Sequence, residues 1–220
     1  KILSLLGLLL LLTWHCTPSS TTSTSDFFDT RPYYFPIEAL DAGLVYEYHT
    51  IQGDQSYRSH FWHLTSHVNG SDTFLTWKRY NPLFEQDQYI EEQIFADGAV
   101  VKAYYLYAYD SLRQRRQAYP VEQDAIFPFR AATDSNMVYR YSASMTLPPD
   151  FVTVQLNRDR RFNGPLSQSY TYDGRDLPAI VFFSKDLYYL EDTTEGGFWD
   201  DQRRVYEYYA EGIGLVETQE

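Results

Sequence analysis

The stretch YIEEQIFADGAVVKAYYLY, residues Tyr89–Tyr107, decides the fold. Apolar and polar residues alternate along both of its halves, which is typical of strands with one buried face. The central Asp97-Gly98 favours a tight hairpin because both residues tolerate positive φ. A two-residue turn at this dipeptide pairs Ile90 with Tyr105. The stretch therefore predicts a half-buried antiparallel hairpin.

One face of this hairpin is expected to be mainly apolar. It carries a single charge, that of Glu92, together with Ile90, Ile94, Val101, Ala103, Tyr105 and Tyr107. Tyrosine presents an apolar wall with a hydroxyl tip, which suits the lining of a ligand pocket. The candidate ligand-lining residues are therefore Tyr105, Tyr107, Ile90 and Ile94. Ordinary packing of a tyrosine-rich core is the alternative.

The same pattern continues through residues 26–220. The chain has 21 Tyr and 14 Phe but only 2 Met, and aromatic residues suit a pleated surface. Three further turn dipeptides separate extended runs, namely Asn69-Gly70, Asn163-Gly164 and Asp173-Gly174. About ten strands, spaced by about 8 to 14 residues, predict an all-β domain built as an antiparallel curved sheet, a half-barrel or a barrel. Beyond the N-terminal segment we expect little helix, and the best candidate, residues 110–117, is equally compatible with a loop.

Residues 1–16 have the layout of a secretory signal. Lys1 precedes an apolar run, Ile2–Leu12, which is shorter than the roughly 20 residues that a membrane span needs. Cys16, the only cysteine, follows this run. The arrangement resembles the bacterial lipoprotein signal, in which that cysteine is lipid-modified and becomes the N-terminus. The resemblance implies that Cys16 anchors the protein to the lipid bilayer of the cell envelope, with the outer membrane expected and either a periplasmic or a surface-facing domain.

Thr13 and His15 depart from the lipoprotein pattern, which has an aliphatic and a small residue at these places. Ordinary secretion and a retained short anchor therefore remain alternatives. Residues 17–25 contain only Pro, Ser and Thr, which predicts a flexible tether. The expected organisation is a signal peptide at 1–16, a tether at 17–25 and a single β domain at 26–220.

The C-terminal run YYAEGIGLV, Tyr208–Val216, resembles the closing strand of a group of bacterial envelope lipoproteins. The turn YTYDG at 170–174, followed by LPAI at 177–180, resembles their penultimate hairpin. This group is similar to the lipoprotein-carrier (LolA/LolB-like) half-barrels and to TapB-like domains of unknown function. Gly212 and Gly214 are expected to bend the strand or to admit another element at close range.

Composition and motifs exclude several function classes. The net charge of -12 disfavours a nucleic-acid binder, because neutralising phosphates needs clustered Lys and Arg. The short run Arg158, Arg160 and Arg161 is expected on a solvated face. The chain has no phosphate-binding glycine loop, no G-x-S-x-G elbow and no H-E-x-x-H motif. We expect no cofactor. The weak metal candidates are His60, His63 and His67, but residues 60 and 63 of a strand point to opposite faces.

The sequence therefore predicts a non-enzymatic, envelope-anchored binding module for an apolar or amphipathic ligand or for an envelope partner protein. Two alternatives stay open. One is a surface carbohydrate-binding or structural lipoprotein, and the other is a hydrolase that uses carboxylates. Apolar walls around an interior space would favour the binding module. Exposed aromatic rings would favour the carbohydrate-binding or structural lipoprotein, and converging buried carboxylates would favour the hydrolase.

Overall fold

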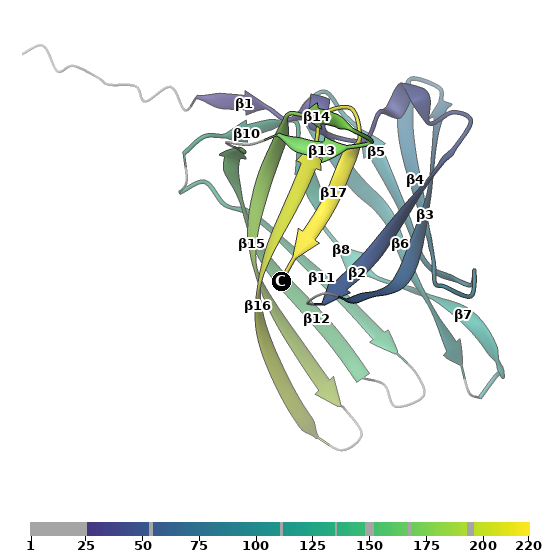
Figure 1. The fold of residues 1–220 in the computed structure, drawn as a ribbon. Coiled ribbons are helices and arrows are strands. Elements are labelled where there is room, and N and C mark those ends of the chain that lie inside the picture. Colours follow the sequence, from purple (N-terminus) through teal and green to yellow (C-terminus); the bar gives the residue numbers. More distant parts are fainter. Residues whose placement is uncertain are drawn as a thin grey trace, which may run out of the picture.

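The computed structural model describes residues 26–52, 55–110, 112–134, 136–147, 152–166, 169–192 and 196–220. Two antiparallel sheets curl toward each other (Figure 1), so the expected all-β fold with a curved antiparallel sheet is confirmed. The predicted signal peptide with Cys16, and the tether, lie outside the described residues.

The first sheet has seven strands, in the order β2-β3-β4-β5-β6-β7 with β9 also paired to β6. Its strands are β2 (Leu44–Gln52), β3 (Gln55–Asn69), β4 (Asp72–Tyr80), β5 (Gln86–Ile94), β6 (Gly98–Asp110), β7 (Arg115–Pro120) and β9 (Ile126–Pro128). The second sheet has six strands, in the order β17-β16-β15-β12-β11-β8. They are β8 (Glu122–Gln123), β11 (Tyr139–Leu147), β12 (Val152–Pro165), β15 (Ala179–Asp192), β16 (Gly197–Ala210) and β17 (Gly214–Gln219).

Two short strand pairs and two 3-10 turns complete the fold. β1 (Phe27–Asp29) pairs with β10 (Arg130–Ala132), and β13 (Tyr170–Tyr172) pairs with β14 (Arg175–Leu177). The 3-10 turns are η1 (Arg31–Tyr33) and η2 (Ile37–Ala39). The helix considered for residues 110–117 is wrong: Asp110 ends β6, residues 112–114 form a turn, and Arg115 begins β7. The Asp110 carboxylate accepts hydrogen bonds from the backbone N–H groups of Leu112 and Arg113, which stabilises the turn instead.

The turn dipeptides differ in what they form. Asp173-Gly174 is the expected two-residue turn of β13 and β14, with φ of 49° and 70°. Asn69-Gly70 lies at the β3–β4 hairpin, where Asn69 pairs with Asp72. Asn163-Gly164 is no turn, because β12 continues through it and Gly164, with φ of 94°, lies where the pairing with β15 shifts. A glycine at such a bulge bends the strand without a steric cost.

The register predicted for the β5–β6 hairpin is wrong. Ile94 pairs with Ala99, so the loop has four residues, and the pairing shifts again between Glu91 and Glu92. Ile90 consequently pairs with Tyr104, while Tyr105 pairs with Tyr89. A shift by one residue moves a side chain to the opposite face of the sheet.

The two sheets meet along two seams. At one, residues 115–128 bond to both sheets: Val121 N–H donates to the Tyr104 carbonyl at 2.9 Å, while β8 pairs with β11. At the other, Tyr46 and Tyr48 of β2 donate their hydroxyls to the Ile213 and Leu215 carbonyls, at 3.1 and 2.6 Å. Side chains rather than a backbone ladder therefore close this second seam.

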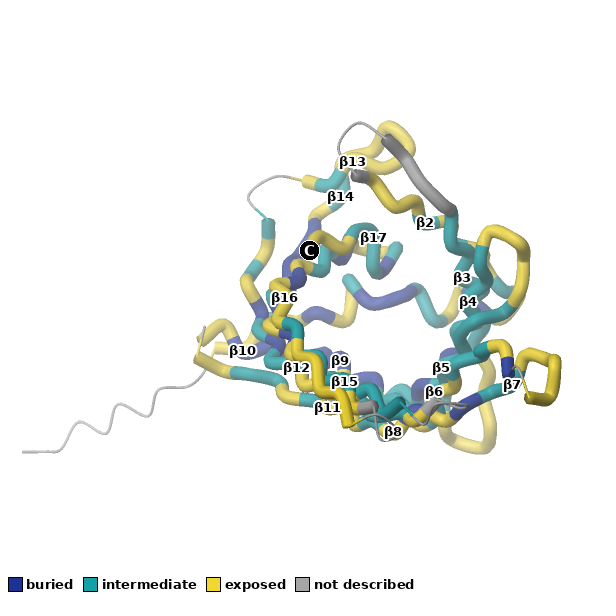
Figure 2. Tube along the Cα trace, turned by 90° about the horizontal axis from the view of Figure 1, so that it is seen from below, coloured by how far each residue is buried: buried dark blue, intermediate teal, exposed yellow. Residues whose placement is uncertain are grey.

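The hydrophobic core lies at one end of the space between the sheets, where residues 30–40 form a plug. The Phe35 ring packs on Trp77 of the first sheet at 4.6 Å, and the Tyr34 ring packs on Phe127 at 5.0 Å. The backbone N–H of Gly212 donates to the Pro32 carbonyl at 2.9 Å, which ties the plug to the second sheet. Seen along the strands, the sheets surround buried segments of this core (Figure 2).

Candidate functional site

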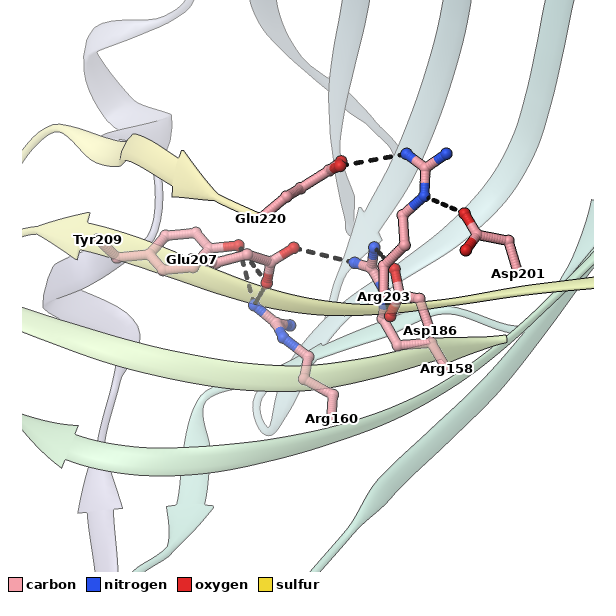
Figure 3. A network of polar contacts seen from close by, with 8 residues as sticks. All are labelled: Arg158, Arg160, Asp186, Asp201, Arg203, Glu207, Tyr209 and Glu220. Carbon is pink, nitrogen blue, oxygen red and sulfur yellow. Dashed lines mark hydrogen bonds and ion pairs between the residues drawn. The ribbon is translucent and has the colours of Figure 1, made fainter. Parts of the chain in front are cut away.

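A row of charged side chains crosses the inner face of the second sheet directly beside the core (Figure 3). Its members, which we call the charged belt, are Arg158 and Arg160 of β12, Asp186 of β15, and Glu207 and Tyr209 of β16. Strand alternation places them together, because Arg158 pairs with Asp186, and residues two apart share a face. The inner face of β12 thus includes its even-numbered residues.

Glu207 links the two arginines of the belt. Its carboxylate lies 2.9 Å from Arg158 Nη1 and 2.7 Å from Arg160 Nη2. Arg158 Nε also donates to Asp186 at 2.7 Å, and Arg160 Nη2 donates to the Tyr209 hydroxyl at 2.9 Å. Charges removed from water in this way need both opposite charges and hydrogen bonds, and the belt supplies both.

The belt holds its carboxylate ionised. Burial alone would raise the pKa of Glu207, but the guanidinium groups of Arg160 and Arg158 outweigh it and the pKa lies below its usual value. The Arg160 guanidinium lies 4.0 Å from the centroid of the Phe182 ring, which adds a cation–π contact. Arg160 thus joins the belt to the aromatic core.

One further carboxylate lies inside the core. Glu92 of β5 is 7% exposed and accepts a short hydrogen bond from the Tyr34 hydroxyl of the plug. Burial raises the pKa of Glu92 to about 7, although the bond from Tyr34 and the charge of Arg160 act in the opposite direction. Glu92 is sealed between the plug and the sheets.

Beyond the belt, the inner faces of both sheets become apolar and aromatic. The second sheet presents Leu156 and Tyr188, beside Tyr141, which pairs with Arg158 at the level of the belt, and the first sheet presents Ile90, Tyr104 and Leu106. Each of these side chains is only half-buried. The two walls face each other, because the two sheets curl toward each other with these faces inside (Figure 1).

The inner face stays accessible farther from the plug. Trp199, which pairs with Leu190 farther along the strands, is 51% exposed, and the side chain of Arg203, which pairs with Asp186 in the row of the belt, is 42% exposed. Arg203 bonds to Asp201 and Glu220 at 2.8 and 3.1 Å. If the sheets packed tightly here, these side chains would be buried. The walls beyond the belt therefore border solvent.

The structure separates the four predicted ligand-lining residues. Ile90 lies on the inner wall, and Ile94 packs against the core. Tyr105, 37% exposed, and Tyr107 lie on the outer face, because Tyr105 pairs with Tyr89. The four residues therefore do not line one pocket, and the register shift of β6 is the reason.

The two strand-bend glycines have different surroundings. Gly214 has φ of 101°, and a Cβ added to it would lie 2.5 Å from the Phe35 ring, so its missing side chain makes room for the plug. Gly212 has φ of 74° and no heavy atom of the described chain within 4 Å of such a Cβ. It lies in the turn before β17.

The three candidate metal-binding histidines do not converge. His60 lies on the inner face with Trp62, whereas His63 and His67 lie on the outer face of β3. The His67 ring stacks on Phe74 at 5.2 Å. Within the described ranges, no group of three or more His, Cys, Asp or Glu is placed to hold a metal ion.

The belt was missed from the sequence. Arg158 and Arg160 were expected on a solvated face, but Arg160 is 5% exposed and both face inward. The spacing of two residues places Arg158 and Arg160 on the same face of a strand. The carboxylates that pair with them, however, come from β15 and β16, which are distant in the sequence. The part of the chain that the structure describes contains no helix long and apolar enough to cross a membrane.

Searches against protein-family models, curated proteins and solved structures found no match to this chain.

Proposed function

We propose that this protein is a non-catalytic binding module that holds an amphipathic ligand between its two sheets. The observation that carries the proposal is that the apolar walls beyond the belt stay half-buried. When a ligand covers apolar surface that borders solvent, the removal of that surface from water is favourable by about 25 cal/mol per Å². The half-buried side chains of Leu156 and Tyr188 on one sheet and of Ile90 and Tyr104 on the other provide such surface.

The walls suit an amphipathic molecule rather than a pure hydrocarbon. Tyr104, Tyr141 and Tyr188 provide ring faces for an acyl chain or a flat apolar body, and their hydroxyls offer hydrogen bonds to a polar part. The charged belt closes this space on the side of the core. Because its arginines are already paired with Asp186 and Glu207, the belt does not require a charged ligand.

The carboxylates of Glu207 in the belt and of Glu92 in the core favour a binding function over hydrolysis. A general base or acid needs a pKa near the working pH and access to the substrate. The pKa of Glu207 lies below its usual value, and both of its oxygens contact guanidinium groups. Glu92 has a pKa of about 7 but is sealed in the core.

The proposed location is the bacterial cell envelope, with a lipid on Cys16 as the anchor. This part of the proposal rests on the resemblance of residues 1–16 to a lipoprotein signal. A half-barrel on a membrane tether would hold its ligand space next to the lipid phase. An envelope partner protein is the alternative occupant of this space.

The proposal is tested by titrating the chain with lauric acid and with dodecyl maltoside in detergent-free buffer, with tryptophan fluorescence as the readout. Trp199 on the inner face should report occupancy. We expect a saturable change in wild type, and a loss of at least tenfold in affinity in Leu156→Asp, which puts a charge on the wall. Leu156→Trp, which fills the space without a charge, should also weaken binding.

Leu187→Asp is the matched control. Leu187 pairs with Asn157 and lies on the outer face of β15, so this variant should bind as wild type does. Circular dichroism checks that each variant folds. A flat titration with both probes, or equal losses in Leu156→Asp and Leu187→Asp, would contradict the proposal.

A further inference from the structure

The outer face of the second sheet carries a hollow of about 300 Å³ that the proposed function does not use. It lies over β12, β15 and β16, which run side by side in Figure 1. Its lining residues are Thr153, Gln155, Asn157, Tyr189, Glu191 and Phe198. On each strand they alternate with inward-facing residues such as Arg158 and Leu190, so the hollow opens on the opposite side of the sheet from the belt.

The register arranges the lining residues in neighbouring cross-strand rows. Thr153, Glu191 and Phe198 form one row, Gln155 and Tyr189 belong to the next, and Asn157 belongs to the third. Rows on the same face of a sheet lie about 7 Å apart. The three rows therefore extend over about 14 Å, with aromatic and hydrogen-bonding groups side by side.

Two aromatic rings form the apolar wall of the hollow. The centroids of Tyr189 and Phe198 lie 6.0 Å apart, with an interplanar angle of 36°. Phe198 is 67% exposed. A solvent-facing ring beside a hollow offers a flat surface on which an apolar face of a ligand can stack.

The other side chains that line the hollow are polar and can form hydrogen bonds with a ligand. Among the described residues, the side chains of Gln155, Asn157 and Glu191 have no hydrogen-bond partner. They provide two amides, which donate and accept, and one carboxylate, which accepts. None of the described residues that line the hollow is a Lys or an Arg.

We propose that this hollow binds a neutral carbohydrate. A pyranose ring has an apolar face of C–H groups that stacks on an aromatic ring, and equatorial hydroxyls that need donors and acceptors at its rim. The paired rings and the amides match these two requirements. The Glu191 carboxylate accepts hydroxyl hydrogens and disfavours a phosphate, a sulfate or an acidic sugar by repulsion.

The test is native gel electrophoresis of the chain in gels that contain a soluble polysaccharide: starch, laminarin, xyloglucan, galactomannan or, as an anionic control, heparin. We expect at least one neutral polysaccharide to slow the protein, with no effect of heparin. Calorimetry with the matching hexasaccharide then measures affinity. It should not change between 50 and 500 mM salt, because the ligand is neutral.

Variants locate the site. Tyr189→Ala and Phe198→Ala should each weaken binding at least tenfold, since each removes a ring on which the apolar face of the sugar stacks. Tyr206→Ala is the matched control, because Tyr206 is an exposed aromatic residue of β16 that contacts Phe183 and not the hollow. Gln155→Ala should weaken binding less than the ring variants.

Three results would overturn the proposal. The first is that no neutral polysaccharide slows the protein, and the second is that heparin alone slows it. The third is that both single variants, Phe198→Ala and Tyr189→Ala, keep the wild-type affinity. A loss in Tyr206→Ala equal to that in Phe198→Ala would also place the site elsewhere. Fluorescence titration with lauric acid should be unchanged in Phe198→Ala, which separates this site from the inner one.

Discussion

The Phe35 ring occupies the space that a side chain at residue 214 would need: a Cβ on Gly214 would lie 2.5 Å from Cδ1 of Phe35. Phe35 is 3% exposed and also packs edge-on against Trp77. The glycine is therefore part of the core packing. Through this contact, the plug and the last strand hold each other in place.

Gly214→Ala should destabilise the fold by about 3 kcal/mol. Positive φ costs a residue with a Cβ about 1 to 2 kcal/mol, and overpacking against the Phe35 ring adds about as much. Gly212→Ala is the control, because Gly212 has φ of 74° but open space around it. Urea unfolding should show a clearly smaller loss for Gly212→Ala, and equal losses would mean that the Phe35 contact is unimportant.

Stability should fall as the pH rises from about 4.5 to above 7. The folded-state pKa of Glu92 is about 7, above the ordinary 4.5, so the folded state holds the proton more tightly than the unfolded state does. The protonated carboxyl therefore adds to the free energy of unfolding, and this contribution is lost once the folded protein loses the proton. Urea unfolding of Glu92→Gln should show a flatter profile and a gain of about 2 to 3 kcal/mol at pH 8. Glu91→Gln, the neighbour on the opposite face, should keep the wild-type profile. An unchanged slope in Glu92→Gln would contradict the assignment.

Removing the shared carboxylate of the belt should be costly. Glu207→Gln leaves Arg160 without its ionic partner beside the Phe182 ring, and breaking a buried pair in this way costs about 3 kcal/mol or more. Asp200→Asn, on the outer face of the same strand, should change unfolding by less than about 0.5 kcal/mol. Denaturant unfolding at pH 7 makes the comparison, and similar values for the two variants would argue against a structural role for the belt.

The seam between β2 and β17 should open more readily without its tyrosine hydroxyls. Tyr48→Phe removes the 2.6 Å bond to the Leu215 carbonyl, and loss of one such bond costs about 1 kcal/mol. Hydrogen exchange should accelerate at the backbone amides of β2 and β17 while β12 and β15 stay protected. Tyr206→Phe, on the outer face, should leave exchange unchanged. Uniform acceleration in Tyr48→Phe would show that the seam does not open locally.

Cys16→Ser should release the protein from the membrane fraction without changing its unfolding curve. Serine cannot carry the thioether-linked lipid whose buried methylenes would anchor the chain. Fractionation of cells that express each form decides the matter. Retention of the serine variant would indicate that the apolar run 2–12 is an uncleaved anchor, and a soluble wild type would indicate ordinary secretion.

Features that depend on neighbouring residues could be read from the sequence alone. The alternation along residues 89–107 predicts two strands, β5 and β6, because a period of two needs only local information. The turn at Asp173-Gly174 follows from the φ preferences of its two residues. The strand content and the antiparallel class were therefore determined by local chemistry.

Faces and partners were decided only by the tertiary structure. The four-residue loop and the shift beside Glu91 turned Tyr105 outward, because the packing of whole sheets, rather than a turn dipeptide, selects the register. Arg158 and Glu207 are 49 residues apart in the chain, so nothing local to the arginine run indicates the carboxylate that neutralises it. The burial of those charges depends on strands brought together by folding, which is why the belt, the plug and the outer hollow appear only in three dimensions.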